Sequence, residues 1–277
     1  MCTTCGCGTD SVTIDGKAHD HGHDHSHDHA HDHDHDHDHD HDHSHDHAPV
    51  HSHAAGVSPE RAVAVERAIL AKNDAEANHN RRLFTRKGIF ALNLVSSPGS
   101  GKTTLLVETI RRLAGELPVT VVEGDQQTSN DADRVRATGA RAVQVNTGKG
   151  CHLDAHMVGH AVEALEPRED SVLMIENVGN LVCPAGFALG EHLKLLIADV
   201  AEGDDKPIKY PGMFTVVDAL VLNKVDLIPY VDFDLDAFRI AVRSLNARAP
   251  LFAVSCRTGE GVKGWVEWLL TKGAGKL

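Results

Sequence analysis

The chain has 277 residues and a formal net charge of −13, with 40 acidic against 27 basic side chains. Its lysines and arginines are scattered, and an acidic N-terminal arm would repel a phosphate backbone, so we expect no nucleic-acid partner. No apolar segment approaches the roughly 20 residues needed to span a bilayer, and the polar N-terminus lacks the apolar core of a secretion signal. We therefore expect a cytoplasmic protein that has no contact with membranes.

A disordered arm over residues 1–57 is predicted to begin with a thiolate metal site. Cys2, Cys5 and Cys7 place three thiols within six residues, close enough to bind one soft or borderline ion without a folded scaffold. Cysteines that cluster in a cytoplasmic chain are better explained as thiolate ligands than as disulfides. Adventitious cysteines in a tail are the alternative, although exposed thiols are prone to oxidation.

A low-complexity tract from His19 to His53 makes up most of the arm. It contains seventeen histidines, mostly alternating with aspartate, and no lysine or arginine. Such a segment cannot form a hydrophobic core by itself. Imidazole suits Ni²⁺ and Zn²⁺, and the carboxylates attract divalent cations, so the tract is expected to take up several ions loosely.

The remaining residues, 58–277, predict one folded domain in which strands and helices alternate. Ser58-Pro59-Glu60 is a helix-start signal, and apolar side chains recur on one helical face as far as about Asn78. A further helix carries Leu105 to Leu113, and others are expected at 130–137, 235–245 and 262–270. Short apolar strands are expected at 89–95, 118–122, 142–145, 171–176, 194–198, 219–222 and 251–254. This alternation predicts an α/β fold, a mostly parallel sheet with helices on both faces and ligands at the carboxyl ends of its strands.

Residues 95–104 predict a nucleotide-phosphate loop between a strand and a helix, as in P-loop NTPases. The pattern G-x-x-x-x-G-K-S/T is met except that Ser96 replaces the first glycine. Glycines let successive backbone N–H groups point at an anion, the lysine supplies a cation, and the following hydroxyl is offered to Mg²⁺. A Gly-Ser turn without a ligand is the alternative. We expect the phosphates to be bound by Ser97, Pro98, Gly99, Ser100, Gly101, Lys102, Thr103 and Thr104, with Thr103 also on Mg²⁺.

Two acidic strand ends are candidates for the Mg²⁺ site. Glu176-Asn177-Val178-Gly179 ends a strand where most GTPases have Asp-x-x-Gly, whose glycine N–H faces the γ-phosphate and whose acidic group reaches the ion. The strand at 118–122 ends in Glu123-Gly124-Asp125, and Asp125 is the second candidate ligand. Ordinary turns are the alternative for both. We expect Lys102, Glu176 and Gly179 to take part in nucleotide hydrolysis.

The stretch Asn223-Lys224-Val225-Asp226 follows a strand and matches the N-K-x-D arrangement of guanine-binding GTPases. One carboxylate, that of Asp226, accepts hydrogen bonds from guanine N1–H and from its exocyclic amine, and adenine offers neither donor in those positions. Ser255 and Cys256 lie downstream, where such proteins hold the base. Together with the phosphate loop, these residues predict GTP as the ligand.

A second metal site is predicted where Gly148-Lys149-Gly150-Cys151-His152 is followed, about thirty residues on, by Cys183. Cys151 and His152 are adjacent, so they can face one ion only from a loop or a helix start. With Cys183 they form a soft set of donors that suits Zn²⁺ or Ni²⁺. A purely structural role is the alternative. His156 and His160 continue at helical spacing, as ligands or as surface residues.

With these motifs assembled, the chain resembles the HypB family of hydrogenase maturation GTPases nearly end to end. The resemblance rests on the N-terminal Cys motif, the histidine tract, the phosphate loop with its usual serine, Glu123-Gly124-Asp125, Gly148-Lys149-Gly150-Cys151-His152, Glu176-Asn177-Val178-Gly179 and the N-K-x-D stretch. It implies slow GTP hydrolysis and insertion of nickel into the immature large subunit of a nickel–iron hydrogenase. It also implies a nickel-carrying partner of the HypA type and a homodimer that forms in response to nucleotide.

Two other functions remain open. A urease accessory GTPase with a histidine-rich head shares the phosphate loop and the N-K-x-D stretch, but it lacks the N-terminal Cys motif and the Gly-Lys-Gly-Cys-His stretch. The second is a nickel storage protein, in which the arm buffers nickel and the GTPase fold is a regulatory scaffold.

Overall fold

The computed structural model describes residues 13–18, 58–125, 130–148 and 150–274. The N-terminal Cys motif and the histidine tract lie outside these residues. Within them, nine strands form one sheet in the order β2-β1-β5-β4-β6-β3-β7-β8-β9. Every neighbouring pair from β5 to β9 is parallel, and only the pairs that involve β1 are antiparallel among the described strands. The predicted α/β fold with a mostly parallel sheet is therefore confirmed.

All seven predicted strands are present, with bounds that differ from the expected ones by about one residue, except that β4 ends three residues later than expected. They are β3 (Phe90–Ser96), β4 (Val119–Asp125), β5 (Arg141–Asn146), β6 (Val172–Glu176), β7 (Leu193–Asp199), β8 (Ala219–Asn223) and β9 (Leu251–Ala253). The helices are α1 (Pro59–Arg86), α2 (Lys102–Leu113), α3 (Asn130–Arg136), α4 (Ala155–Leu165), α5 (Lys206–Lys209), α6 (Pro211–Val216), α7 (Leu235–Leu245) and α8 (Val262–Ala274). None of the helices in the described part of the chain combines the length and the apolar character needed to cross a bilayer.

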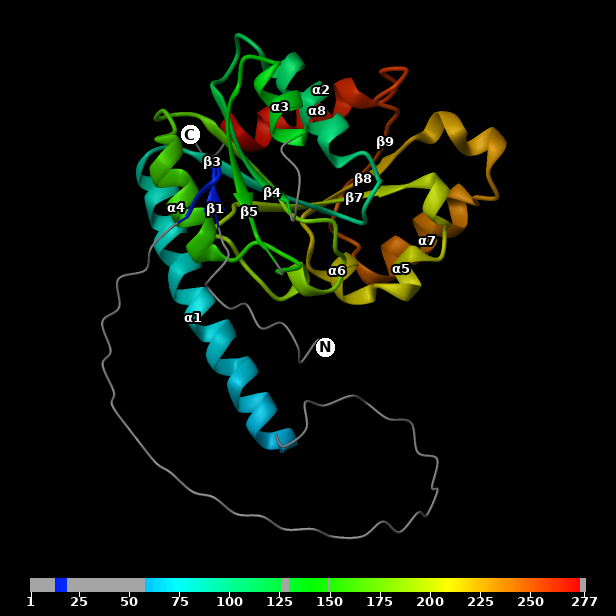
Figure 1. Cartoon of the computed structure of the whole chain (residues 1–277). Helices are drawn as coiled ribbons and strands as arrows, with labels where there is room; N and C mark the ends of the chain where they lie inside the picture. The colour runs from blue at the N-terminus through cyan, green and yellow to red at the C-terminus, as the bar shows by residue number, and fades with distance from the viewer. Residues whose placement is uncertain (1–12, 19–57, 126–129, 149, 275–277) are drawn as a thin grey trace, which may run out of the picture.

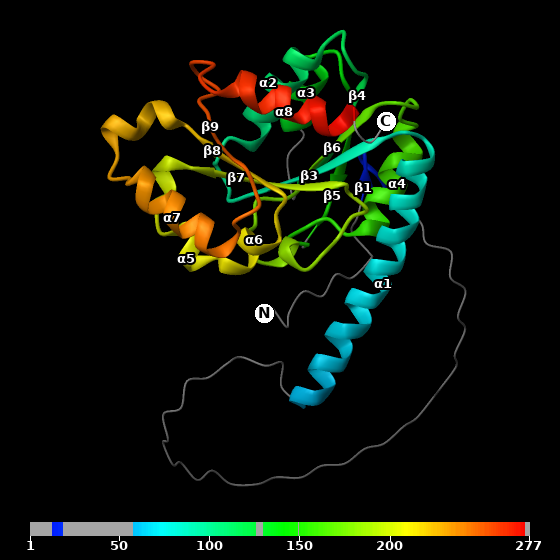
Figure 2. The same cartoon turned by 180° about the vertical axis from the view of Figure 1, so that it is seen from behind.

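Helices cover both faces of the sheet (Figures 1 and 2), which explains why the central strands are continuously apolar. One face of β3 places Phe90, Leu92 and Leu94 in a core with α2, α3 and α8. The opposite face is shared by two cores, one formed with α1 and α4 and the other with α6 and α7. Asn93 lies on this second face and is fully buried, so its amide must find partners inside the protein.

Helix α1 runs through Arg86, well beyond the predicted end near Asn78. Its start agrees with the expected cap, because the hydroxyl of Ser58 accepts a hydrogen bond from Arg61 N at 3.3 Å. Polar and basic residues dominate its last two turns, so the sequence pattern did not show that the apolar face continues to the buried Phe84. The N-terminal half of the helix projects from the body of the protein (Figures 1 and 2).

A hairpin of β1 (Thr13–Ile14) and β2 (Lys17–Ala18) adds an antiparallel edge to the sheet beside β5. Its turn residues, Asp15 and Gly16, have φ of 46° and 74°, and two positive φ values are what a type I′ hairpin turn requires. The expectation of a disordered arm is therefore wrong for residues 13–18. The division of the chain at residue 57 otherwise stays a prediction.

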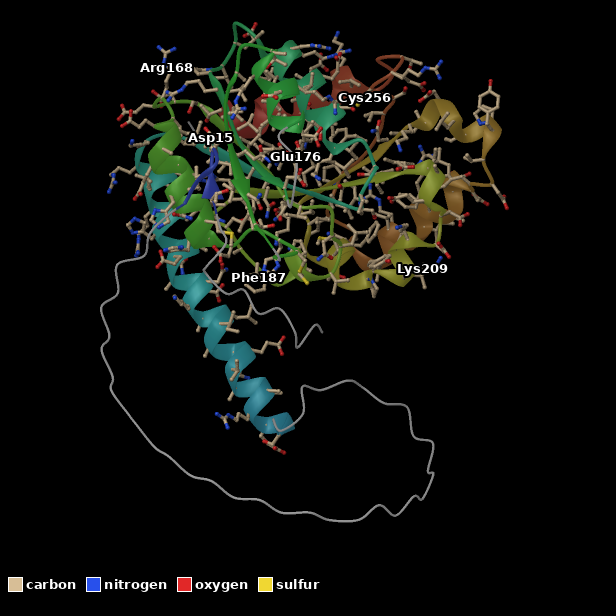
Figure 3. All side chains as sticks on the ribbon, viewed as in Figure 1. Asp15, Arg168, Glu176, Phe187, Lys209 and Cys256 are labelled. Carbon is tan, nitrogen blue, oxygen red and sulfur yellow. The ribbon has the colours of Figure 1, made fainter. Side chains whose placement is uncertain are left out.

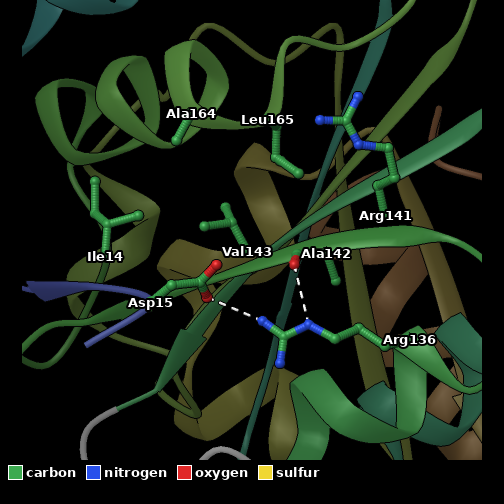
Figure 4. A pocket seen from close by; sticks show the side chains of 8 residues that line it. All are labelled: Ile14, Asp15, Arg136, Arg141, Ala142, Val143, Ala164 and Leu165. Carbon is green, nitrogen blue, oxygen red and sulfur yellow. Dashed lines mark hydrogen bonds and ion pairs between the residues drawn. The ribbon is translucent and has the colours of Figure 1, made fainter. Parts of the chain in front are cut away.

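The hairpin is anchored by Asp15, whose Oδ1 accepts hydrogen bonds from Arg136 Nη2 at 2.9 Å and from Gln144 N at 3.0 Å. Arg136 also donates to the carbonyl of Ala142, and these residues line a pocket between β5, α3 and α4 (Figure 4). Ile14 is buried there. The pocket lies at the sheet edge, away from the phosphate loop, so its contacts serve to hold the hairpin in place.

Candidate functional site

The predicted phosphate loop joins the carboxyl end of β3 to the start of α2. Gly99 and Gly101 have φ of 79° and 86°, in the region that favours glycine. A Cβ on Gly101 would lie 2.5 Å from Nδ2 of Asn223, so space as well as backbone conformation requires glycine there. Gly101 caps α2 without a side-chain hydrogen bond, which leaves the first N–H groups of the helix available for an anion.

Hydrogen bonds within the phosphate loop and from neighbouring segments hold the loop in place. Ser100 Oγ donates to the carbonyl of Ser97 at 3.1 Å, and Lys206 Nζ donates to Ser97 Oγ at 3.2 Å. From the N-K-x-D stretch, Asn223 Nδ2 donates to the carbonyl of Ser100 at 3.0 Å, and Lys224 Nζ donates to the carbonyl of Gly99 at 2.7 Å. The structure thus brings the predicted phosphate residues and the predicted base residues together.

The acidic end of β6 lies directly against the start of α2. Thr103 Oγ1 donates to Glu176 Oε1 at 2.7 Å, and Lys102 Nζ lies 3.5 Å from the same oxygen. Thr104, one residue on, accepts a hydrogen bond from Arg134 Nη2 at 3.1 Å, on the outer side of the helix. In Figure 3 Glu176 lies in the middle of the molecule, and it is 2% exposed.

Glu123 is a candidate site residue that the sequence analysis missed. It is paired with Glu176 in the register of β4 and β6, and Oε2 of each carboxyl group is buried without a hydrogen-bond partner. Burial, together with the nearby charge of Glu176, raises the pKa of Glu123 to about 11. The signal in the sequence was an acidic residue within an apolar strand, two residues before Asp125.

These buried oxygens fit a divalent cation such as Mg²⁺. The ion prefers carboxylate and hydroxyl oxygens, and the two unpartnered carboxylate atoms lie beside Thr103 and the phosphate loop. Thr103, Glu176 and Glu123 are therefore the residues that the geometry favours for holding it. Asp125 ends β4 at the same edge of the sheet and is half-buried, and its role as a ligand stays a prediction.

Gly179 packs against the phosphate loop. A Cβ at this position would lie 3.0 Å from both Cγ and the backbone N of Pro98, so only glycine allows the two segments to approach this closely. The segment after β6 therefore rests on the loop that is predicted to hold the phosphates. This placement is what the expected contact between Gly179 N–H and a γ-phosphate requires.

The predicted base-recognition residues meet at the ends of β8 and β9. Asp226 is 16% exposed and lies 3.8 Å from Arg257 Nη1. Cys256 N donates to Asn223 Oδ1 at 3.4 Å, and Ser255 Oγ accepts a hydrogen bond from Thr258 N at 3.1 Å. Burial raises the pKa of the Cys256 thiol to about 11, so the thiol that lines this region is neutral near pH 7.

The predicted metal ligands Cys151, His152 and Cys183 meet in one cluster. Cys151 Sγ lies 3.2 Å from Cys183 Sγ and 3.5 Å from His152 Nδ1, and the three donor atoms all lie within 4.8 Å of one another. No loop closure and no second subunit is needed to bring Cys183 to Cys151. Burial lowers the pKa of His152, which keeps its imidazole neutral and able to bind a metal. Phe187 covers that imidazole, with ring centroids 4.2 Å apart.

A buried polar network of Asn93, Asn177, Glu191 and Lys194 connects this cluster with β6. Asn177 directly follows Glu176, and its Oδ1 accepts a hydrogen bond from Leu153 N, one residue after His152, at 3.0 Å. Its Nδ2 donates to Asn93 Oδ1 at 3.3 Å, and Asn93 Nδ2 donates to Glu191 Oε1 at 3.1 Å. The network therefore runs from the predicted Mg²⁺ residue to the loop of Cys151.

Lys194 extends the buried polar network to the loop of Cys183. Its Nζ donates to the carbonyl of Pro184 at 2.8 Å and to that of Phe187 at 3.1 Å, and it lies 3.7 Å from Glu191 Oε1. Burial lowers the pKa of this lysine, and the acidic neighbours oppose that shift. Both loops that carry metal ligands are thus hydrogen-bonded to one buried set of side chains.

Replacing Glu123 by Gln is expected to change how stability depends on pH. Because the pKa of Glu123 rises from 4.5 to about 11 on folding, the folded state keeps a proton that the unfolded state releases. The wild type therefore loses stability as the pH rises above 4.5, and the Gln variant escapes this loss. Calorimetry without nucleotide or Mg²⁺ should show a Tm difference that widens between pH 6 and pH 9. A difference that is independent of pH would contradict the prediction.

The chain is similar to known hydrogenase maturation factors. The chain matches the family described as "CobW/HypB/UreG, nucleotide-binding domain" over residues 90–253. It is 56% identical to Hydrogenase maturation factor HypB of Rhizobium leguminosarum bv. viciae, over 97% of this chain and 95% of the relative. It is 45% identical to the protein of that name from Escherichia coli (strain K12), over 98% of this chain and 99% of the relative.

Two solved structures share the fold. HypB from Archaeoglobus fulgidus has a TM-score of 0.69 and 37% identity, with 73% of this chain and 99% of that chain covered. HypB from Helicobacter pylori, crystallised in complex with nickel, has a TM-score of 0.69 and 38% identity, with 73% and 95% covered. Since the phosphate loop, the N-K-x-D stretch and these likenesses agree, the chain is a P-loop GTPase that belongs to the HypB family of hydrogenase maturation factors.

Proposed function

We propose that this GTPase binds nickel at Cys151, His152 and Cys183 and delivers it to the immature large subunit of a nickel–iron hydrogenase. The observation that carries the proposal is the convergence of two thiols and a neutral imidazole within 4.8 Å, on two loops tied to the nucleotide end of β6. Thiolate and imidazole donors suit Ni²⁺ and Zn²⁺. The related HypB from Helicobacter pylori has been crystallised with nickel, which supports nickel as the cargo.

For GTP hydrolysis, we assign the phosphate loop and the end of β6 to the reacting phosphates. Lys102 binds the β- and γ-phosphates and leaves its ion pair with Glu176 when it does so. Thr103, Glu176 and Glu123 hold Mg²⁺, and Asp125 is a further ligand candidate. When bound, the ion neutralises charge on the phosphates. Gly179 N–H holds the γ-phosphate from the segment that rests on Pro98.

Nucleotide and nickel are coupled through Asn177 in this proposal. The residue follows Glu176 in sequence and precedes Gly179 by two positions, so any shift of that segment on binding a γ-phosphate moves its side chain. Leu153, beside His152, is hydrogen-bonded to that side chain. Nickel and the γ-phosphate must therefore favour or disfavour each other by the same factor, since binding free energies are linked.

The arm, the partners and the location complete the proposal. The histidine tract stores nickel, and Cys2, Cys5 and Cys7 form a further site for Ni²⁺ or Zn²⁺. A HypA-type accessory protein exchanges nickel with this chain, the GTP-bound form is a homodimer, and the protein works in the cytoplasm. These parts are supported by the sequence motifs and by membership of the family.

The test uses the full-length chain with its arm ligands removed. An arm-silent variant carries Asn for each histidine between 19 and 53 and Ser at Cys2, Cys5 and Cys7, so that the hairpin at residues 13–18 stays connected. We expect its Ni²⁺ affinity to differ by about 5- to 150-fold between GDP and a non-hydrolysable GTP analogue, which is the usual size of such coupling. In the same variant with Cys183→Ala, the affinity should fall and the nucleotide effect should vanish. Equal affinities in all four measurements would contradict the proposal.

The arm-silent variant and Cys183→Ala together separate delivery from storage. A delivery protein without its arm should support hydrogenase maturation when nickel is plentiful and fail when nickel is scarce. With the arm intact, Cys183→Ala should impair maturation if the cluster delivers nickel, whereas normal maturation in that variant would favour the storage function instead.

A further inference from the structure

Lys206 lies beside the phosphate loop and has no role in the hydrolysis assigned above. It begins α5, shortly after β7, which is the parallel neighbour of β3 and pairs Ile197 with Ser96 at the start of the loop (Figures 1 and 2). The segments that follow these two strands therefore begin side by side at the carboxyl edge of the sheet. Lys206 Nζ donates a hydrogen bond to Ser97 Oγ at 3.2 Å, and the lysine side chain is only 17% exposed. A largely buried cation thus contacts the loop that is to receive the phosphates.

The contact with Ser97 places this cation at the γ-phosphate end of the loop. Ser97 directly precedes Pro98, and the residue that packs against Pro98 is Gly179, whose N–H is proposed to hold the γ-phosphate. Lys102 lies at the other end of the loop, where α2 begins. Lys206 therefore reaches the loop next to the residue on which the γ-phosphate segment rests.

The present partners of Lys206 hold it less tightly than those of Lys224, which also donates to the loop. Lys224 Nζ has a carboxylate partner at hydrogen-bond distance, Asp199 Oδ2 at 2.9 Å. Lys206 instead donates to a neutral hydroxyl, and its carboxylate partner, Glu202 Oε2, lies 3.7 Å away. A charged phosphate oxygen forms a shorter and stronger hydrogen bond with an ammonium group than a hydroxyl does. A bound triphosphate should therefore draw Lys206 away from Ser97.

Glu202 and Tyr210 hold the ammonium group near the loop without taking up its hydrogen-bond donors. Glu202 ends the short 3₁₀ helix Val200–Glu202, and its Oε2 is buried without a hydrogen-bond partner. The ring of Tyr210, four residues after Lys206, lies 5.1 Å from Nζ, which is within the distance of a cation–π contact. An ammonium group has three N–H donors, so Lys206 can bind phosphate oxygens while both contacts persist.

We propose that Lys206 is a catalytic residue that leaves Ser97 when GTP binds and donates to an oxygen of the γ-phosphate. There it stabilises the negative charge that is spread over the γ-phosphoryl oxygens in the transition state. Water forms the new bond to the γ-phosphorus while the bond to the β–γ bridging oxygen breaks, and the electron pair of that bond stays on GDP. The oxygen of the water ends in inorganic phosphate, its protons end in phosphate and solvent, and Lys206 keeps its own. This inference rests on the proposed position of the γ-phosphate beside Gly179 and is independent of nickel delivery.

Nucleotide affinities and single-turnover GTP hydrolysis, measured on the full-length protein with Mg²⁺, test this role. In Lys206→Gln, the affinity for a non-hydrolysable GTP analogue should fall at least about 10-fold while that for GDP changes less than about 2-fold, because only the triphosphate offers a γ-oxygen. The hydrolysis rate should fall about 10²-fold. Lys206→Arg keeps the positive charge and should restore part of both losses. The control is Lys263→Gln on α8, where the side chain is 82% exposed, and it should change neither quantity.

A second background shows whether Lys206 acts on the phosphate or only on the loop. If it acts only by holding Ser97, then Lys206→Gln should have no effect on the hydrolysis rate in a Ser97→Ala background. The proposal expects the same fold-change there as in the wild type, because the two side chains then act independently. Absence of the effect in that background, or equal losses of GDP and GTP-analogue affinity in Lys206→Gln itself, would overturn the proposal.

Gly179→Ala tests the position of the γ-phosphate separately. We expect this variant to lose selectivity for the GTP analogue over GDP, as Lys206→Gln does, because each should weaken a contact with the γ-phosphate. Loss of selectivity in Gly179→Ala alone would reject the role of Lys206 and leave the proposed function intact. Unchanged selectivity in both variants would reject the proposed position of the γ-phosphate and this inference with it.

Discussion

Replacing Asp226 by Asn is expected to lower the affinity for GTP by about 10²-fold or more and to make XTP the better ligand. In the proposed site the carboxylate accepts hydrogen bonds from both guanine donors, and a site built to hydrogen-bond a group rejects ligands that leave its polar atoms unpaired. The amide presents a donor where guanine also presents one, whereas xanthine offers a carbonyl oxygen there. Asp226 is 16% exposed, so little water is available to compensate for the mismatch.

Nucleotide affinities from competition against a fluorescent GDP analogue measure this change directly. Asn223 and Lys224 keep their hydrogen bonds to the phosphate loop in the variant, so the loss is confined to the base. Asp236→Asn is the matched control, because that carboxylate is 85% exposed on α7, where it forms a surface ion pair with Arg239. A variant at Asp226 that still prefers GTP would show that another group reads the base.

Replacing Lys194 by Met is expected to destabilise the fold by about 3–5 kcal/mol, because removing one partner of a buried ion pair leaves the other charge uncompensated. Glu191 is the charge left behind, and the carbonyls of Pro184 and Phe187 lose their donor. In a domain of this size the change corresponds to a fall in Tm of about 10 °C. The loop that carries Cys183 loses its anchor, so Ni²⁺ affinity in the arm-silent background should fall as well.

Two comparisons make the Lys194 result specific. Lys209→Met removes an exposed ion pair with Asp205, at 2.6 Å on the surface helix α5 (Figure 3), and such pairs contribute about 0–1 kcal/mol. Adding Glu191→Gln to Lys194→Met removes the stranded charge and keeps an acceptor oxygen, so part of the stability should return. If Lys194→Met unfolds at the wild-type temperature, the buried polar network does not hold the loop.

The sequence was sufficient to predict the residues whose chemistry demands fixed spacing. Gly101, Lys102 and Thr103 must fall at the start of a helix that follows a strand, and the guanine-reading carboxylate must follow another strand. Each of these spacings can be recognised in the sequence without knowledge of the tertiary contacts. The cluster of Cys151 and Cys183 was predicted for a different reason, since these soft donors, with His152, suit Ni²⁺ or Zn²⁺ and stand in a chain that also carries a metal-binding motif in its arm.

Residues that depend on pairing between distant strands could not be predicted in this way. Glu123 and Asp125 have the same chemistry and lie two positions apart on one face of β4. Only the register of β4 against β6, which pairs Glu123 with Glu176, distinguishes them. Asn93 interrupts an apolar strand, but the sequence does not say that its partner Glu191 lies 98 residues further along the chain. The hairpin at residues 13–18 was overlooked because its short turn signal stands between polar segments.

The two hydrogen bonds from Asn223 and Lys224 to the phosphate loop have a consequence for how the two ends of GTP are bound. The carbonyls of Ser100 and Gly99 are fixed by the same residues that precede the guanine-reading carboxylate. A base that orders this stretch also restricts the phosphate loop. The conformational entropy of the loop is therefore lost only once, when either the base or the phosphates bind, and the second group binds without that cost. For the proposed site, guanine and the phosphates therefore bind cooperatively, because the bound purine restricts the motion of the loop that receives the triphosphate.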